Sequence, residues 1–416
     1  MTDERLACHV DQRQWSMTSP VTQSIGEDEA LHEVTMPPPS SPVSGSLLVF
    51  AQCFRSRKLP VWIRSSRSVN VAATDDKESN VKRLIAAAVA VGGLITAGGI
   101  GSPAHASSGH ESFSFAVIGD IPYGDAQIAN FPNVISQINA DRDVRLVMHA
   151  GDIKSGSSQC SDTYFALIRS DFDLFADPLV YTPGDNEWTD CHRPNNGGYN
   201  PLERLAAVRA LFFPHPGRTL GQRTMSVKAQ SKLGFPENVR FDRADVTFAA
   251  LHVIGSNNSL VNWTGQTSPT AEQLAEVQAR TSADLRLIEE TFAHAEDEHS
   301  NAVVLMLQAD MFDPTVANPQ FTDYSAFQTI VQTIAAESAS FAKPVILFNG
   351  DSHVFTEDHP LAAGSSWLSF YGVTTLAPNL TRVTVDGSTG VNDWVKVTID
   401  DDDPNVLSWV TVPFLP

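Results

Sequence analysis

Four apolar runs in this chain end abruptly in the dipeptide Gly-Asp. The aspartates that close these runs are Asp120, Asp152, Asp185 and Asp351. Each run has the length and residue types of a buried parallel strand, so each aspartate is expected where a strand leaves its sheet. The carboxyl ends of such strands line the ligand crevice of open α/β folds, so the four carboxylates should gather there. Because they would repel one another unless a cation neutralised them, the pattern predicts a metal site.

Residues 82–106 have the pattern of a secretory signal. Lys82 and Arg83 precede a stretch rich in Gly and Ala, which ends in an A-x-A cleavage pattern at residues 104–106. A transmembrane anchor is the alternative, but the stretch is only weakly apolar. We therefore expect a signal peptide at residues 81–106 and a domain at residues 107–416, secreted by a bacterial cell and without a membrane span in the mature chain.

The first 80 residues precede this signal, although a signal peptide belongs at the start of a chain. They lack sustained periodicity and are rich in Ser, Pro and Arg. We hypothesise that Val81 is the real initiator and that residues 1–80 are not translated; a disordered extended leader is the alternative. N-terminal sequencing of the native protein distinguishes the two, because material that begins within residues 1–80 contradicts the hypothesis.

The charge of the chain is strongly acidic, with a net value of −20. Residues 1–106 carry ten basic and ten acidic side chains, so the whole excess belongs to the remaining residues, which suffice for one large core. An acidic surface disfavours nucleic acid and favours cations. Cys160 and Cys191 are the two cysteines that follow the signal, and in an oxidising compartment one disulfide is expected. Each follows a Gly-Asp motif closely, so the bridge would join two loops of the site.

Predicted strands and helices alternate along the exported domain, which indicates an α/β fold. Strands are expected at residues 112–118, 144–149, 179–181, 246–253, 302–307 and 344–348, and helices at residues 128–140, 161–176, after 201, after 270 and at 325–341. After residue 355 the pattern changes to alternation typical of antiparallel strands, at residues 380–388, 393–401 and 406–414.

Five sequence blocks resemble the metal-binding blocks of calcineurin-like metallophosphoesterases. They read GDIP, GDIK, GDNEW, LMLQAD and GDSH, where the family has D-x-H, G-D, G-N-H-[DE], an isolated His and G-H-x-H, in the same order and with similar spacing. The resemblance spans nearly all of residues 107–416. It implies a four-layer α/β/β/α sandwich with mixed sheets and C-terminal antiparallel strands. It also implies one or two divalent metal ions that clamp a phosphate ester and activate water.

The resemblance implies a set of six metal ligands. They are Asp120, Asp152, Asp185, Gln308, Asp351 and His353. The substitutions within the blocks exchange nitrogen ligands for oxygen ligands, which favours Mn²⁺, Mg²⁺ or Ca²⁺ over Fe or Zn. Pro122 stands where the first block has its histidine, so a cation bound by Asp120, Asp152 and His353 would lack a fourth protein ligand. Candidates to complete it are Glu187, Asp190 and His192.

The resemblance implies only part of a set of catalytic residues. Asn186 stands where the family has its transition-state-stabilising histidine, and it would donate to the phosphoryl oxygens. Asn cannot supply a proton, so His192 is the candidate that protonates the leaving group. The predicted function is a secreted, metal-dependent phosphoesterase that hydrolyses small-molecule phosphate mono- or diesters by a metal-bound hydroxide. The alternative is a catalytically inactive member that acts as a binding or surface protein.

Several side chains near the blocks receive structural interpretations. We expect His149 to be a core residue, and His252 is undecided between the core and the site. Lys154 is expected in an exposed loop unless it contacts phosphate. Tyr123 and Trp188 are expected to pack at the rim of the site.

Overall fold

The structure is a computed structural model that describes residues 113–400 and 402–415. The predicted signal peptide at residues 81–106 and the segment 1–80 lie outside the described residues. Within the described part of the chain, no helix is long and apolar enough to cross a membrane.

The first sheet has five strands and carries the first three Gly-Asp motifs at its strand ends. Its order is β12-β11-β1-β2-β3. The strands are β1 (Phe113–Ile118), β2 (Val144–His149), β3 (Leu179–Tyr181), β11 (Asp393–Ile399) and β12 (Leu407–Pro413). β1, β2 and β3 are parallel, whereas β11 and β12 are antiparallel to their neighbours.

The second sheet has seven strands in the order β4-β5-β6-β7-β8-β10-β9. The strands are β4 (Lys228–Gln230), β5 (Phe235–Arg243), β6 (Val246–Ala250), β7 (Ala302–Met306), β8 (Val345–Asn349), β9 (Thr356–Asp358) and β10 (Leu380–Thr384). β6, β7, β8 and β10 are parallel, and antiparallel strands flank them on both sides.

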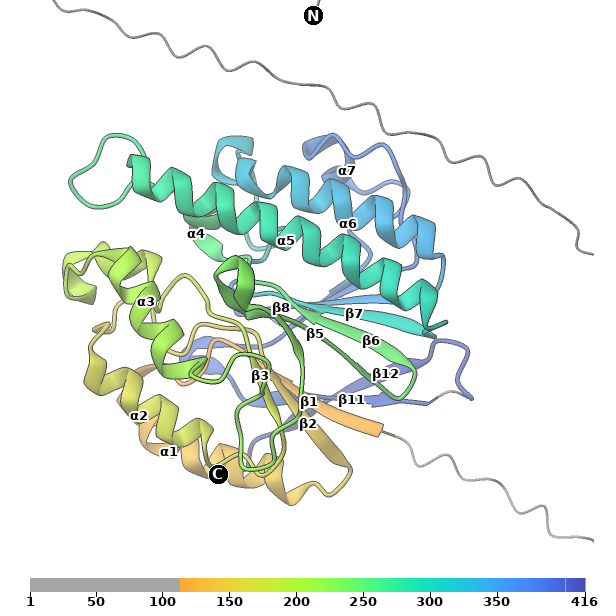
Figure 1. Ribbon diagram of the computed structural model, residues 1–416, viewed down its shortest axis with the longest axis horizontal. Helices are drawn as coiled ribbons and strands as arrows, with labels where there is room; N and C mark the ends of the chain where they lie inside the picture. Colours follow the sequence, from red (N-terminus) through yellow and green to blue (C-terminus); the bar gives the residue numbers. More distant parts are fainter. Residues whose placement is uncertain (1–112, 401, 416) are drawn as a thin grey trace, which may run out of the picture. The chain divides into compact units, whose positions relative to one another are not determined.

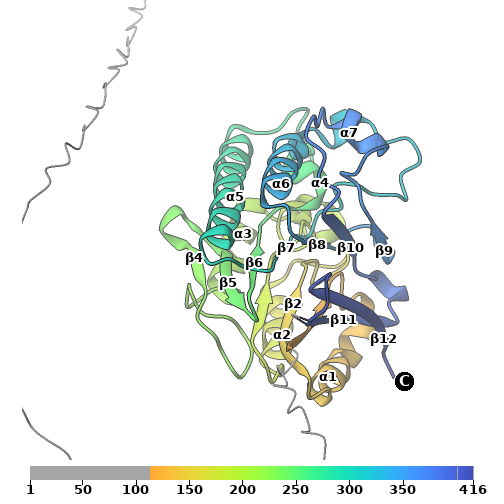
Figure 2. The same cartoon turned by 90° about the vertical axis from the view of Figure 1, so that its right-hand side faces the viewer.

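The helices cover the outer faces of the two sheets (Figure 1; Figure 2). The α-helices are α1 (Gly124–Ala140), α2 (Asp162–Phe172), α3 (Pro201–Phe212), α4 (Gly255–Ser259), α5 (Ala271–Asp297), α6 (Gln328–Phe341) and α7 (Ser366–Phe370). The 3-10 helices are η1 (Thr189–His192), η2 (Pro194–Asn196), η3 (Ser231–Leu233), η4 (Phe321–Asp323), η5 (Ser325–Phe327) and η6 (Ser388–Gly390). α1, α2 and α3 pack on the first sheet, and α5 and α6 pack on the second.

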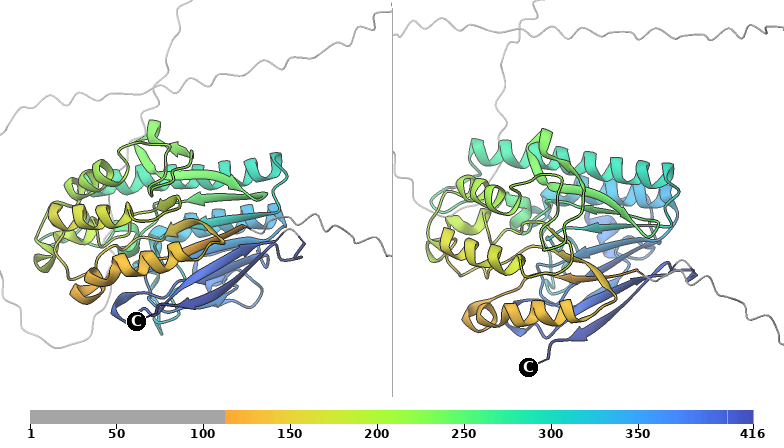
Figure 3. Two further views of the ribbon diagram at one scale, coloured as in Figure 1. Left: turned by 90° about the horizontal axis from the view of Figure 1, so that it is seen from below. Right: turned by 60° about the horizontal axis from the view of Figure 1, so that its bottom comes forward.

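The core is divided into layers by the sheets (Figure 3). Between the sheets, the ring of Phe115 contacts those of Phe248 and Phe348 at centroid distances of 5.4 and 6.0 Å. Further apolar layers lie between each sheet and its helices. This arrangement confirms the predicted α/β/β/α sandwich with mixed sheets.

The start of the longest helix, α5, is fixed by its own sequence. Thr270 Oγ1 accepts a hydrogen bond from the backbone N–H of Gln273, and the Gln273 side chain accepts one from the Thr270 N–H. This capping box satisfies two backbone donors that a helix N-terminus leaves unpaired. The predicted helix start after residue 270 is therefore confirmed.

The predicted strands and helices are found within a few residues of their expected positions, with two differences. The hairpin of β4 and β5 and the short strand β9 were not predicted, because their sequences show little alternation. The tail contains the expected antiparallel strands β11 and β12, but β10 joins the second sheet, where it is parallel to β8 and antiparallel to β9. Alternation shows that one face of a strand is buried, but not which neighbour it joins.

His149, at the end of β2, is a buried core residue in a fixed neutral form. Its Nδ1 accepts the backbone N–H of Gly151 at 3.2 Å, and its Nε2 lies 3.0 Å from the carbonyl oxygen of Ile121. A proton on Nδ1 would face another donor. Burial lowers the pKa of His149 from 6.5 to about 4, against a smaller opposing effect of the Ile121 carbonyl.

His149 should make the folded state less stable as the pH falls. Its pKa is depressed by folding, so the unfolded chain binds the proton more tightly between pH 6.5 and about 4. The contribution of neutral His149 to the free energy of unfolding is fully present above pH 6.5. It decreases by ~3 kcal/mol as the pH falls through that range. Urea unfolding of wild type and His149→Gln should show the difference in unfolding free energy shrinking by that amount from pH 7 to pH 4. The exposed His215→Gln serves as control, and a difference independent of pH would contradict the assignment.

Candidate metal centre

The carboxyl ends of the parallel strands of both sheets meet at one place. Asp120 follows β1 and Asp152 follows β2, while Asp351 follows β8 of the other sheet. The two sheets are joined there directly, because the backbone N–H of Asp351 lies 3.1 Å from both carboxylate oxygens of Asp120. The strand ends that carry the Gly-Asp dipeptides therefore gather where the two sheets meet.

The acidic side chains form two groups that could each hold a cation. One group consists of Asp120, Asp152 and His353, and the other of Asp152, Asp185 and Asp351. Within each group, one ligand atom from every residue lies within 4.8 Å of the others. Asp152 belongs to both groups, and a carboxylate has two oxygens with which to serve two cations. The geometry therefore offers two adjacent cation positions with one shared ligand.

The backbone turns that aim these side chains are left-handed. Asp120, Asp152 and Asp351 have φ values of 52°, 55° and 75°, and His353 has 63°. This region costs free energy for residues other than glycine, although Asp tolerates it better than most. Such strained residues concentrate at functional sites, where the surrounding structure holds them in place.

Glycines allow the backbone to approach the carboxylates closely. A Cβ on Gly255 would lie 2.7 Å from an Asp185 oxygen and 2.9 Å from both oxygens of Asp351. A Cβ on Gly350 would lie only 2.0 Å from an oxygen of Asp120. No larger side chain fits at either position without moving a carboxylate.

The protonation of these carboxylates reflects their crowding. Burial raises the pKa of Asp152 well above its ordinary value, and the neighbouring charges of Asp185, Glu187, Asp120 and Asp351 raise it further. Burial likewise raises the pKa of Asp351 and of Asp120. A bound cation reverses this effect, because it favours the charged form. Buried oxygen donors that repel one another, with a single imidazole, fit hard divalent cations.

Gln308 lies in the same crevice but presents a different atom from the one expected. Its Oε1 accepts the backbone N–H of Gly255 at 2.6 Å, and its Nε2 lies 3.4 Å from Asp185 Oδ1. In this orientation the amide nitrogen of Gln308 is a hydrogen-bond donor to the Asp185 carboxylate and orients it. Its role as a metal ligand remains a prediction.

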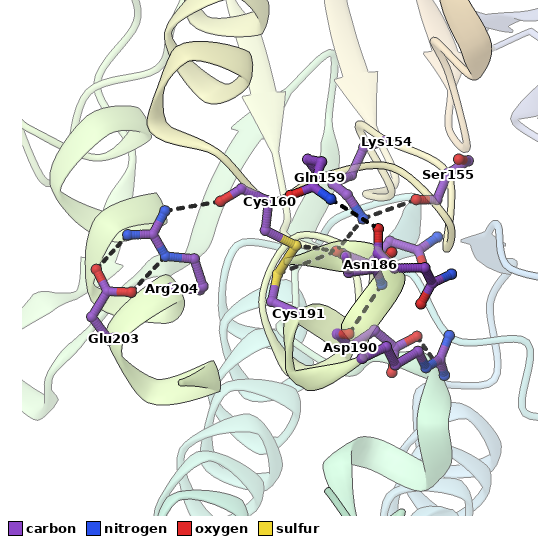
Figure 4. The surroundings of a disulfide bond; sticks show 12 residues. Lys154, Ser155, Gln159, Cys160, Asn186, Asp190, Cys191, Glu203 and Arg204 are labelled. Atoms are coloured by element: carbon purple, nitrogen blue, oxygen red, sulfur yellow. Dashed lines mark hydrogen bonds and ion pairs between the residues drawn. A yellow bond between two sulfur atoms is a disulfide. The ribbon is translucent and has the colours of Figure 1, made fainter. Parts of the chain in front are cut away.

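Asn186 lies inside the site, and its backbone is held by the disulfide loop (Figure 4). The predicted Cys160–Cys191 disulfide is present, and both sulfur atoms lie against the Asn186 carbonyl oxygen, at 3.5 and 3.6 Å. Lys154 Nζ donates to the same oxygen at 2.9 Å and to the carbonyl of Ser155 at 2.8 Å. Lys154 is therefore fully buried, and its expected place in an exposed loop is wrong. Burial lowers its pKa from 10.5 to about 8.

Of the three candidates for a fourth ligand, Asp190 and His192 are engaged elsewhere, whereas Glu187 keeps one buried oxygen, Oε2, without a hydrogen-bond partner among the described residues. Glu187 Oε1 accepts two backbone N–H groups, from Asp152 at 3.0 Å and Gly184 at 2.8 Å, and the hydroxyl of Tyr181 at 2.8 Å. Asp190 pairs with Arg193 and accepts from Ser256. His192 lies on the partly exposed loop beside Thr264, whose hydroxyl is 2.8 Å from its Nδ1.

Tyr123 reaches the carboxylates that these candidates do not contact. Its hydroxyl donates to Asp152 Oδ2 at 3.1 Å and accepts from Asn186 Nδ2 at 3.0 Å. Tyr123 was expected to pack at the rim, and only its place three residues after Asp120 could have indicated otherwise.

The prediction that Trp188 packs at the rim of the site is confirmed in part. Trp188 is buried, and its Nε1 donates to His252 Nε2 at 3.1 Å. The other nitrogen of His252 lies 2.8 Å from Glu237. His252 therefore belongs to a buried polar network behind the loop that follows Asp185.

Residues 113–267 match the model of a known family, described as calcineurin-like phosphoesterase. This segment contains β1, β2 and β3 with three of the four Gly-Asp ends. This segment is therefore similar to calcineurin-like phosphoesterases, and the resemblance stated from the sequence blocks is confirmed there.

The solved structures that resemble this chain are remote. One is described as GAP50, the anchor in the inner membrane complex of Plasmodium, with 9% identity over 73% of this chain and 90% of that chain and a TM-score of 0.38. Another is purple acid phosphatase PPD1 from yellow lupin (Lupinus luteus) seeds, with 11% identity over 73% of this chain and a TM-score of 0.39. The match spans 54% of the lupin protein. No curated protein sequence matches.

A buried ion pair supports the loop that carries Asp351. Arg382 on β10 is fully buried, and its guanidinium pairs with Asp310 and, more outwardly, with Asp358. Asp310 in turn accepts the hydroxyl of Ser352 at 2.7 Å, and its backbone N–H donates to Asp351 Oδ2 at 3.2 Å. The pair therefore connects the second sheet to the candidate metal centre.

Gly255→Ala should weaken cation binding at the group of Asp152, Asp185 and Asp351. The added methyl must displace two carboxylates, so we expect affinity to fall ~10-fold or more while the fold persists. Titration calorimetry with Mn²⁺ measures this. Gly390→Ala is the matched control, because its Cβ would meet open space. Unchanged affinity in Gly255→Ala would show that the cation lies elsewhere.

Arg382→Met should destabilise the domain by about 3 kcal/mol, since it leaves the buried Asp310 without its cation partner. Chemical denaturation measures the change. Arg286→Met removes a partner of an exposed helix pair with Glu290, and should cost less than ~0.5 kcal/mol. Equal effects of the two substitutions would exclude a supporting role for Arg382.

Proposed function

We propose that this protein is a secreted, metal-dependent phosphoesterase that hydrolyses phosphate mono- or diesters of small molecules. The observation that carries the proposal is the sharing of Asp152 between two groups of potential ligands. A shared carboxylate places two cations side by side, which suits an ester whose attacking and leaving oxygens must both be stabilised.

The ligands divide between the two cation positions. Asp120, Asp152 and His353 would hold one, and Asp152, Asp185 and Asp351 the other. Divalent cations bound there would supply Lewis-acid activation of water and of the phosphoryl group. The carboxylates are held in place before any ligand arrives, because backbone N–H groups and Ser256 donate to them.

Asn186 is the residue we assign to the phosphoryl oxygens. Its Nδ2 donates to Asp152 Oδ2 at 2.6 Å and to the Tyr123 hydroxyl at 3.0 Å, so a phosphoryl oxygen would compete for one of these N–H groups. The disulfide loop and Lys154 fix its backbone, which favours a preorganised donor.

None of the residues that we assign to the cations or to the phosphoryl oxygens has the role of proton donor to the leaving group. His192, the candidate from the sequence, bonds to Thr264 in this structure. This observation favours either esters with good leaving groups or the second candidate function, a catalytically inactive binding protein.

Secretion is supported by two features. A disulfide is present between Cys160 and Cys191, and structural disulfides persist in oxidising compartments. The sequence of residues 81–106 also has the signal-peptide pattern. An acidic surface suits a small anionic substrate only where cations are bound, which agrees with the proposed dependence on metal.

Metal stoichiometry of single variants tests the proposal. We expect two Mn²⁺ ions per wild-type chain, one in Asp120→Asn, one in Asp351→Asn and none in Asp152→Asn, because only Asp152 belongs to both groups. Hydrolysis of aryl phosphate mono- and diesters should fall to background in Asp152→Asn and after chelation. Asp297→Asn, which changes an exposed residue at the end of α5, is the matched control.

The possible outcomes separate the two candidate functions. Metal binding in this pattern without turnover of any ester would support the binding protein. Absence of both metal and turnover in the wild type would contradict the phosphoesterase and leave the binding protein standing.

A further inference from the structure

Two cationic side chains lie beside the carboxylates of the candidate metal centre. Lys154 is fully buried, and its ammonium donates to the backbone carbonyls of Ser155 and Asn186, so it cannot contact a ligand from solvent. Arg193, in the loop after Asp185, has 38% of its side chain exposed. Of the two, it is therefore Arg193 that can contact a molecule entering the centre.

The Arg193 guanidinium is held on one side and free on the other. Its Nη2 donates to Asp190 Oδ2 at 2.7 Å, and the Asp190 side chain is buried. Ser256 Oγ lies 2.9 Å from Asp190 Oδ1 and 2.8 Å from Asp185 Oδ2, so the anchor of Arg193 is connected to the centre. No second acceptor contacts the guanidinium in the described part of the chain, which leaves N–H donors for a ligand.

The same guanidinium lies near Asn186, the residue assigned to the phosphoryl oxygens. A Cβ on Gly156 would lie 2.9 Å from Asn186 Oδ1 and 3.6 Å from Arg193 Nη1, so both atoms flank one point of the backbone. Because Gly156 has no side chain, none separates the two groups there. An oxyanion that accepts a hydrogen bond from the Asn186 amide would therefore have Arg193 as a neighbour.

The charges of the centre give this arginine its importance. The carboxylates of the two cation groups are those of Asp120, Asp152, Asp185 and Asp351. Bound cations favour the charged form of these groups, and two divalent ions would then leave no net charge. Glu187 and Asp190 add two negative charges, which Lys154 and Arg193 balance. Without Arg193 the centre would be negative and would repel an anionic ester.

We propose that Arg193 binds a non-bridging oxygen of the substrate phosphate and thereby selects monoesters over diesters. A monoester presents one more non-bridging oxygen than a diester, and more negative charge. The planar guanidinium offers paired N–H donors that match phosphate oxygens. In a diester, the second ester group takes the place of the oxygen that Arg193 contacts.

The inference rests on the proposed phosphoesterase and narrows its substrate class from mono- or diesters to monoesters. Arg193 lies outside the five sequence blocks. Its place beside Asn186 follows from its pair with Asp190 and from the Cys160–Cys191 disulfide, which fixes the loop that carries all three residues.

Phosphate binding and ester selectivity of Arg193→Gln test the proposal. Titration calorimetry of the Mn²⁺-loaded protein with inorganic phosphate should show affinity ~10-fold or more below that of wild type, because a charge-assisted hydrogen bond is lost. The ratio of kcat/KM for 4-nitrophenyl phosphate to kcat/KM for bis(4-nitrophenyl) phosphate should fall by a similar factor. Arg193→Lys should restore part of both, since it keeps the charge but not the paired donors.

Arg223→Gln is the matched control. Arg223 also pairs with an aspartate, Asp177 at 2.6 Å, but Asp177 precedes β3, whereas Asp185 follows that strand at its other end. This substitution should leave both measurements unchanged. Equal metal content in wild type and Arg193→Gln establishes that the centre of the variant is intact.

The outcomes separate this inference from the proposed function. Unchanged phosphate affinity and selectivity in Arg193→Gln would overturn the assignment of Arg193 and leave the phosphoesterase standing. Lower phosphate affinity in a protein whose wild type hydrolyses no ester would keep Arg193 as a phosphate ligand and contradict the phosphoesterase. If phosphate binds wild type too weakly to measure, the ratio of kcat/KM values alone decides. A wild type that neither binds phosphate nor hydrolyses any ester would overturn both.

Discussion

The repulsion among buried carboxylates at the meeting ends of the two sheets is the constraint on which this structure depends. Asp120, Asp152 and Asp351 come from three different strands, and burial together with the charges of neighbouring carboxylates raises the pKa of each. Folding holds them together through backbone donors, such as the N–H of Asp351 to Asp120. A cation in each group would remove this repulsion, so metal binding there would stabilise the folded state.

The protein behind these carboxylates is organised to keep them in position. Arg382 and Asp310 hold the loop of Asp351, while Lys154 holds the carbonyl of Asn186. The Glu187 carboxylate accepts hydrogen bonds from the backbone N–H groups of Asp152 and Gly184, and so joins the two loops that carry them. Outer contacts of this kind fix the orientation of metal ligands and influence affinity strongly.

The chemistry of the centre differs from that expected of a histidine-rich site. Oxygen donors dominate both groups, and His353 is the one imidazole among the residues of the two groups. The metal preference therefore depends on the whole set of donor atoms and cannot be inferred from any single sequence block.

The sequence by itself determined an α/β fold, the disulfide and the convergence of the Gly-Asp ends, which follow from strand–helix alternation, from two cysteines and from apolar runs. The four layers followed only from the resemblance of the sequence blocks to a known family. Only the tertiary structure decided which side chains face the crevice. Lys154 is buried against the Asn186 carbonyl, and His192 contacts Thr264. The Tyr123 hydroxyl contacts two carboxylates that follow different strands. Such choices depend on contacts between segments far apart in sequence, and the packing of two sheets fixes them.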